Sequence, residues 1–91
     1  MPALIGQTGI LQSVNTAFGL SLQELRKGKG LSQEQLAFDA RLSRNYISLL
    51  EKGQRSPTLA TMQQLSRALG TTLTYLVSRV EAHLAEQRGD Q

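Results

Sequence analysis

The sequence has no cysteine and a single histidine, His83, among its 91 residues. Disulfides, thiolate metal sites and cysteine nucleophiles are therefore excluded, and one imidazole cannot build a histidine-rich metal cluster. Aromatic residues make up 4% of the chain and tryptophan is absent, which argues against an aromatic platform for single-stranded nucleic acid. We expect neither a metal nor a cofactor.

Long apolar runs are also missing, because none reaches the roughly 18 residues that a membrane helix needs. The segment 1–14 has no basic leader and is interrupted by Gly6 and Gly9, so it is a poor signal peptide and predicts a cytoplasmic protein. It is apolar without a clear period, which leaves a disordered arm, a short extra helix and a partner-pairing strand open. We separate it from a central domain, 15–78, and from a C-terminal helix extension and tail, 79–91.

The positive charge of the chain is concentrated in one block. Residues 26–55 hold seven basic and three acidic side chains, a net charge of +4, whereas residues 1–25 carry −1 and residues 56–91 carry zero. A basic block of this kind suits a polyanionic partner. A solvated surface without such a partner has the same composition.

From about Asn15 onward, apolar residues recur at helical spacing and predict five helices joined by short loops. Ser32, Ser43 and Thr72 are suited to begin helices, and glycines are suited to end them. The third helix is predicted to run from Arg44 to about Lys52. The inner faces of the first three helices are expected to hold Phe18, Leu22, Leu25, Leu36, Ala37, Ala40, Ile47 and Leu50. The apolar positions of the fourth helix are Leu59, Met62, Leu65 and Leu69, and the fifth contains Leu73, Leu76, Val77, Val80 and Leu84. No segment shows the alternation of a strand, so the fold class is all-α.

The second and third predicted helices are separated by a short turn at residues 41–42, which is the arrangement of a helix-turn-helix unit. With Ile47 and Leu50 facing inward, Arg44 and Asn45 face outward in the first turn of the third helix. Arginine can bind guanine through O6 and N7, and asparagine can bind adenine through N6 and N7. That first turn is the part of such helices that enters the major groove. An ordinary packing helix could expose the same two residues.

The chain resembles the Xre-type, phage repressor/Cro-like helix-turn-helix domains in three segments: LRKGKGLSQEQLA, LSRNYISLLEKGQRSPTL and LSRALG. The resemblance spans roughly residues 18–78 and implies a five-helix lambda-repressor-like domain, here with an extended C-terminal helix. The second segment is most similar to restriction–modification controller proteins. The resemblance implies a transcriptional regulator that binds a specific double-stranded DNA site, and not an enzyme.

The resemblance also assigns roles to single residues. Gln33 matches the position that bonds a backbone phosphate, with simple helix capping as its alternative. Tyr46 matches a position that touches DNA, with packing against the second helix as its alternative. Arg26 and Glu51 match a structural salt bridge between the first and third helices. The residues that match base or phosphate contacts, together with Lys52 as a general electrostatic contributor, are Ser43, Arg44, Asn45, Tyr46, Ser48, Lys52, Arg55 and Ser56.

Two positions depart from the family pattern. Arg41 occupies the turn position that usually holds glycine, and a left-handed conformation there would cost about 1 kcal/mol. Leu49 is expected to face outward where some relatives place a polar base-reading residue, so it meets a thymine methyl group or packs at the helix edge.

The last helix predicts a partner chain. Leu73, Val77, Val80 and Leu84 are spaced by 4, 3 and 4 residues, like a coiled-coil seam. We expect a C2 homodimer with Val77, Val80 and Leu84 in its interface, binding a palindromic or pseudo-palindromic operator. The alternative is that this stripe folds over the N-terminal segment of its own chain. His83 is expected in the interface or at the surface.

A second class of function is compatible with the same fold, namely an antitoxin that binds a toxin or a protein-interaction adaptor. The apolar segment 1–14 keeps this alternative open. An enzyme is not expected. A hydrolase needs a nucleophile with its base or paired carboxylates in a cleft, and the single histidine and the scattered acidic residues of this sequence supply neither.

Overall fold

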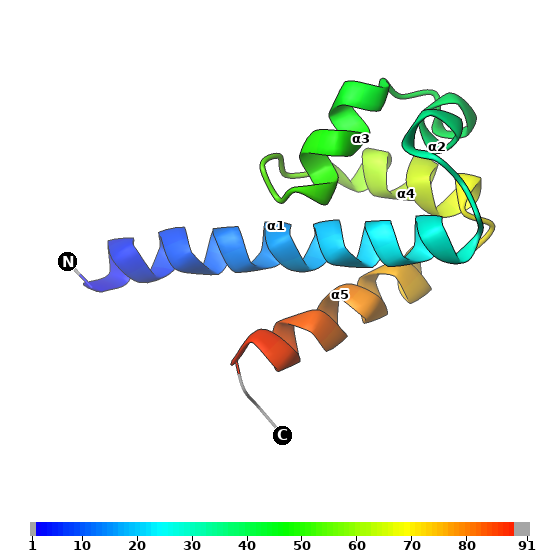
Figure 1. Ribbon diagram of the computed structural model, residues 1–91. Coiled ribbons are helices and arrows are strands. Elements are labelled where there is room, and N and C mark those ends of the chain that lie inside the picture. The colour runs from blue at the N-terminus through cyan, green and yellow to red at the C-terminus, as the bar shows by residue number, and fades with distance from the viewer. Residues whose placement is uncertain (1, 89–91) are drawn as a thin grey trace.

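The computed structural model describes residues 2–88, with side chains described for residues 13–87. Over this range the chain forms five α-helices and no strand, which confirms the predicted fold class. They are α1 (Pro2–Gly28), α2 (Gln33–Ala40), α3 (Arg44–Glu51), α4 (Leu59–Ala68) and α5 (Leu73–Arg88). Helix α1 runs between α5 on one side and α2, α3 and α4 on the other (Figure 1).

Helix α1 is longer than the periodic pattern indicated, because its 27 residues begin at Pro2 rather than near Asn15. Proline suits the first turn of a helix, where its missing N–H group would have no partner. Of the three forms left open for the segment 1–14, residues 2–14 adopt the helix, continuous with the rest of α1. This N-terminal part extends beyond α3 and α5 (Figure 1).

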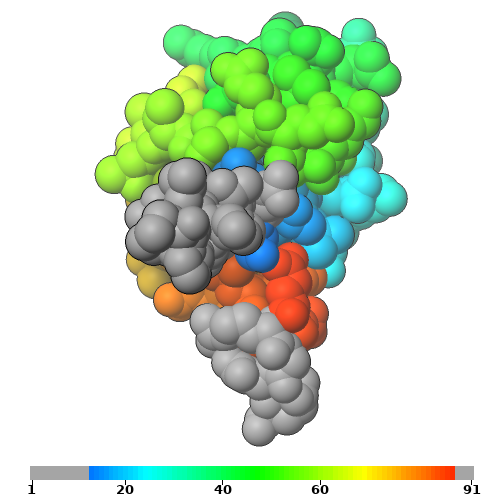
Figure 2. Space-filling model, turned by 90° about the vertical axis from the view of Figure 1, so that its left-hand side faces the viewer, coloured from blue at the N-terminus to red at the C-terminus, as the bar shows by residue number. Residues whose placement is uncertain are grey.

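The core is an apolar cluster to which all five helices contribute. Phe18 and Leu22 of α1 lie at helical spacing and are buried. The other buried members are Ala17, Leu36, Ala37, Ala40, Ile47, Leu50, Leu65, Leu69, Leu76 and Val80. Seen from the N-terminal end of α1, the residues of α3 and its following loop lie above α1, and the last turns of α5 lie below it (Figure 2). Of the apolar positions of α4, Leu59 does not join the core: it is the first residue of the helix and is 65% exposed.

Gly19 sets the distance between α1 and α3. A Cβ atom at this position would lie 2.5 Å from the carbonyl oxygen of Glu51 and 2.6 Å from that of Leu50. Both atoms belong to the backbone at the end of α3, so they cannot move aside as a flexible side chain could. A residue without a side chain therefore lets the C-terminal end of α3 rest directly on α1.

Helix α5 packs along α1 of its own chain, and this corrects the predicted dimer interface. Val80 is only 8% exposed, and Leu84 packs against the core. The stripe therefore faces α1 of its own chain, and of the three predicted interface residues Val77 alone is exposed. His83 is also buried, with its Nε2 atom 2.9 Å from Oε1 of Glu24 on α1. None of the described helices is long and apolar enough to span a membrane.

Candidate nucleic-acid interface

Helix α2 begins and ends with specific backbone chemistry. The Ser32 hydroxyl accepts a hydrogen bond from the backbone N–H of Gln35 at 3.0 Å, and the Gln35 side chain accepts one from the backbone N–H of Ser32 at 3.3 Å. This is the predicted capping box. At the other end Arg41 adopts the left-handed conformation, with φ 61° and ψ 43°. Among the described residues it is the one non-glycine residue with a positive φ, so the departure from glycine carries backbone strain.

Helix α3 presents a polar first turn on an apolar base. The Ser43 hydroxyl caps the helix by accepting from the backbone N–H of Tyr46 at 3.0 Å. Ile47 and Leu50 are completely buried, as predicted, and they fix the rotation of α3 about its axis. Arg44 and Asn45 are exposed at the start of the helix, while Ser48 and Leu49 are half-buried farther along. The turn that can reach a DNA groove is thus supported from beneath by the core.

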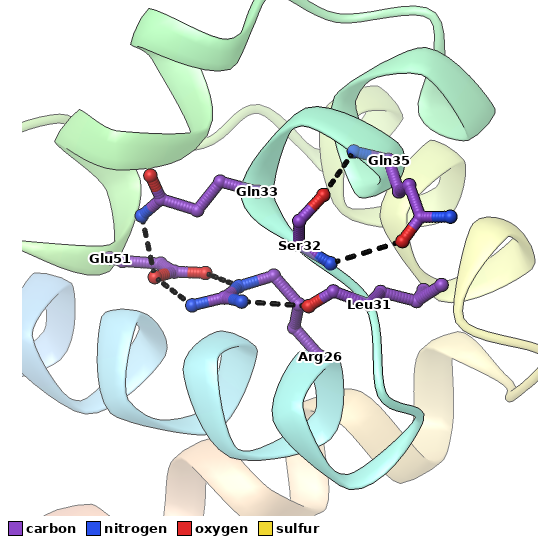
Figure 3. Close-up of polar contacts among 6 residues, drawn as sticks. All are labelled: Arg26, Leu31, Ser32, Gln33, Gln35 and Glu51. Carbon is purple, nitrogen blue, oxygen red and sulfur yellow. Dashed lines mark hydrogen bonds and ion pairs between the residues drawn. The ribbon is translucent and has the colours of Figure 1, made fainter.

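A buried ion pair fixes the other end of α3. Glu51 accepts from Nε of Arg26 at 2.6 Å and from Nη2 of Arg26 at 3.1 Å, and the two side chains are 3% and 9% exposed. The Nη1 atom of Arg26 donates to the carbonyl oxygen of Leu31 at 2.8 Å. Figure 3 shows how this network joins the end of α1, the loop before α2 and the last residue of α3. The salt bridge that the family resemblance implies between Arg26 and Glu51 is therefore present.

Gln33 also belongs to this network, and this contact is not evident from the sequence. Its Nε2 atom donates to Oε1 of Glu51 at 2.9 Å (Figure 3). An amide nitrogen carries two hydrogens, so one remains available for a phosphate oxygen. Neither helical spacing nor a short motif relates residues 18 positions apart, so no sequence pattern predicts this contact.

The loop after α3 returns to the start of that helix. Gly53 has φ +74°, and the chain then leads to Arg55 and Ser56, both exposed. The guanidinium carbon of Arg55 lies 5.4 Å from the centre of the Tyr46 ring, within the range of a cation–π contact. Tyr46 is half-buried and packs against the core, so its ring takes part in packing as well as facing the loop.

The structure gathers the predicted residues around one helix, and we call them the α3 surface: Gln33, Ser43, Arg44, Asn45, Tyr46, Ser48, Lys52, Arg55 and Ser56. Ion pairs among the described side chains engage Arg26, Arg79 and His83. Within that part of the chain, Arg44, Lys52 and Arg55 therefore have no carboxylate partner. The α3 surface combines unneutralised cations with hydrogen-bond donors, which suits a polyanion. Within the described residues there is no group of three acidic or histidine side chains that could hold a metal ion.

Comparison with known proteins identifies the same arrangement elsewhere. The sequence model of the helix-turn-helix family HTH_3 matches residues 22–76. The control protein C.MunI of a Mycoplasma species is 39% identical over 72 residues, which are 78% of this chain and 97% of the relative. The restriction–modification controller protein C.AhdI of Aeromonas hydrophila has a solved structure that is 44% identical, with a TM-score of 0.67 over 68% of this chain and 94% of that chain. The clp gene regulator ClgR of Corynebacterium glutamicum, at 26% identity, reaches a TM-score of 0.80 over 84% of this chain and 81% of that chain.

Proposed function

Because the chain belongs to the HTH_3 helix-turn-helix family of DNA-binding transcriptional regulators, which are not enzymes, we propose that it recognises a specific double-stranded DNA site through α3. One observation carries this proposal: Arg44 and Asn45 are exposed in the first turn of a helix whose far end is held by a buried ion pair. These two side chains suit guanine and adenine edges in the major groove.

Phosphate contacts would supply most of the affinity and base contacts the specificity. Gln33 at the start of α2 and Arg55 in the loop after α3 flank the recognition helix along the chain, and Lys52 adds positive charge at its end. Contacts from both flanks fix a helix in register on the duplex, which direct readout requires.

The test of this function is selection of preferred duplexes from a random pool, followed by affinity measurements over a series of salt concentrations. We expect one preferred half-site and an affinity that falls steeply as salt increases. Absence of binding to any duplex at low salt would overturn the proposal. The antitoxin or adaptor alternative depends on the side chains of residues 1–12, which lie outside the described residues.

Arg44→Ala tests direct readout. We expect a loss of about 1–3 kcal/mol at one base position, with relaxed specificity there, because a bidentate contact to a base is removed. Arg67→Ala is the control, since it removes the same charge from α4, outside the α3 surface. Fluorescence anisotropy on the selected duplex and on its single-base variants measures both. A loss for Arg44→Ala that is equal on all sequences would instead identify a phosphate contact.

We also propose that the regulator acts as a C2 homodimer, whose two α3 helices reach half-sites about one DNA turn, ~34 Å, apart. Val77 is 38% exposed, and together with Leu73 and Thr74 it lines a shallow groove on α5. The structure of the controller protein C.Esp1396I, 22% identical to this chain, is described as a tetramer in complex with its natural 35 base-pair operator. That description concerns the relative, and it supports assembly on DNA as a hypothesis for this chain.

Val77→Asp should weaken the dimer, because it places a charge in an apolar contact. Val14→Asp is a matched control on α1, since Val14 is 37% exposed against 38% for Val77. Sedimentation equilibrium compares the two variants with the unmodified chain. The same monomer–dimer equilibrium in all three proteins would contradict an interface at Val77.

A further inference from the structure

One contact of the α3 surface joins two residues with separate expected roles. Tyr46 lies in the first turn of α3, and Arg55 lies nine residues later in the loop before α4. The ring of Tyr46 and the guanidinium group of Arg55 are 5.4 Å apart. The loop cation is therefore held beside the turn that carries Arg44 and Asn45.

The ring is the fixed partner in this contact. The backbone N–H of Tyr46 is bonded to the Ser43 hydroxyl at 3.0 Å, and its half-buried ring packs against the core. Arg55 is exposed, and an unrestrained arginine side chain has many rotamers to lose when it binds. The ring therefore positions the arginine, and not the reverse.

The loop reaches this ring because its beginning is held in place. The backbone N–H of Gly53 donates to the carbonyl oxygen of Leu50 at 3.1 Å, and that of Gln54 donates to the carbonyl oxygen of Leu49 at 3.0 Å. A Cβ atom on Gly53 would lie 3.1 Å from the Thr16 hydroxyl oxygen and 3.2 Å from the Thr16 Cα atom. The loop is thus packed on α1 two residues before Arg55.

We propose that Tyr46 is a positioning residue that presents Arg55 to a DNA backbone phosphate. A cation–π contact at this distance uses none of the hydrogen bonds that the guanidinium group can donate. The N–H groups of Arg55 therefore stay available, and they can bind a phosphate in a bidentate manner. Among the described side chains no carboxylate competes for these N–H groups. The arrangement lowers the ordering cost of the contact before DNA arrives. This inference rests on the proposed function, since it names the partner of the same surface.

A double-mutant cycle tests the coupling. The proteins are the unmodified chain, Tyr46→Leu, Arg55→Ala and the double variant, with thermal unfolding as a control that each folds. Arg55→Ala should reduce the slope of log affinity against log salt by about 0.9, the value for one lost phosphate contact on duplex DNA. Tyr46→Leu should lower affinity and slope in the same direction, and it should cause no further loss in the Arg55→Ala background. Tyr46→Phe keeps the ring, so its slope should lie closer to that of the unmodified chain than the slope of Tyr46→Leu does.

A measurement on the free protein separates this inference from the proposed function. The ring current of Tyr46 should shift the Arg55 Cδ protons upfield in the NMR spectrum, and the shift should persist in Tyr46→Phe and vanish in Tyr46→Leu. A missing upfield shift, or a Tyr46→Leu loss that persists without Arg55, would overturn the positioning role. If the unmodified chain binds no duplex at low salt, the proposed function fails and the phosphate partner fails with it, whatever the NMR result.

Discussion

At the scale of single residues, Gly19 is the position at which the backbone of α1 lies against the backbone of α3. Gly19→Ala should lower the free energy of unfolding by about 1–3 kcal/mol, because a methyl group there overpacks against the carbonyl oxygens of Glu51 and Leu50. Urea denaturation measures the change.

The same helix provides a control for this substitution. Gly28→Ala lies at the end of α1, where the added Cβ has no atom within 4 Å apart from the neighbouring backbone of its own helix, so stability should stay the same or increase by up to about 1 kcal/mol. Equal destabilisation by the two substitutions would mean that helix propensity, and not the approach of α3, governs Gly19.

Residue types predicted contacts between residues close in the sequence well, and contacts between residues far apart in the sequence poorly. Ser32 and Ser43 cap α2 and α3 as their positions before helical runs predicted, because capping depends on residues only three positions away. The left-handed conformation of Arg41 agrees with the family pattern, which usually has glycine at this turn position. The bond between Gln33 and Glu51 depends on how two helices meet, and a single sequence contains no such information.

At the scale of helices, the Arg26–Glu51 pair tests how α1 and α3 are joined. Glu51→Ala should cost about 3–5 kcal/mol of stability, because it leaves the buried Arg26 guanidinium without its counter-charge. Replacing both residues, as Arg26→Met with Glu51→Leu, should cost much less, since no unpaired charge remains. Thermal and chemical unfolding of the three proteins measure this difference. A double variant as unstable as Glu51→Ala would show that the lost hydrogen bonds to Gln33 and Leu31, and not the unpaired charge, cause the destabilisation.

Helical periodicity located the helices better than it located their neighbours. It identified α2, α3 and α4, whose apolar residues leave few alternative faces. It missed the start of α1, because Gly6, Gly9 and scattered apolar residues give no period before Asn15. For α5 it indicated an apolar stripe but not the element that covers this stripe. The spacing of the apolar residues is the same whether a partner helix or α1 of the same chain packs on them. Val80 and Leu84 were assigned to a partner for that reason.

At the scale of the whole molecule, the stability of the domain should depend on pH through the α1–α5 contact. The hydrogen bond from His83 is the main cause that holds the pKa of Glu24 below its usual value; the nearby charges of His83 and Arg79 act in the same direction, and partial burial acts against them. Glu86 faces the other ring nitrogen of His83, with Nδ1 3.5 Å from its Oε1. A carboxylate with a lowered folded pKa stabilises the fold above its unfolded pKa, about 4.3, and this stabilisation is lost as pH falls through the folded pKa.

Urea denaturation between pH 7 and pH 3 measures this loss. Glu24→Gln should flatten the acid side of the stability curve, because the titrating group is gone. Glu81→Gln removes an exposed carboxylate from α5 that takes no part in the ion pairs of the described side chains. It should leave the curve unchanged, so curves that agree for both variants would contradict the role of Glu24.

Glu51 holds the end of α3 from two directions, through its carboxylate on Arg26 and Gln33 and through its carbonyl oxygen against Gly19. If α3 binds a duplex as proposed, a helix fixed in this way has little freedom to follow irregularities of the DNA, so the DNA would have to adjust its own shape. Base steps that bend or twist easily would then be favoured even where no side chain touches them. The operator that the protein prefers would then depend in part on how readily its DNA sequence deforms.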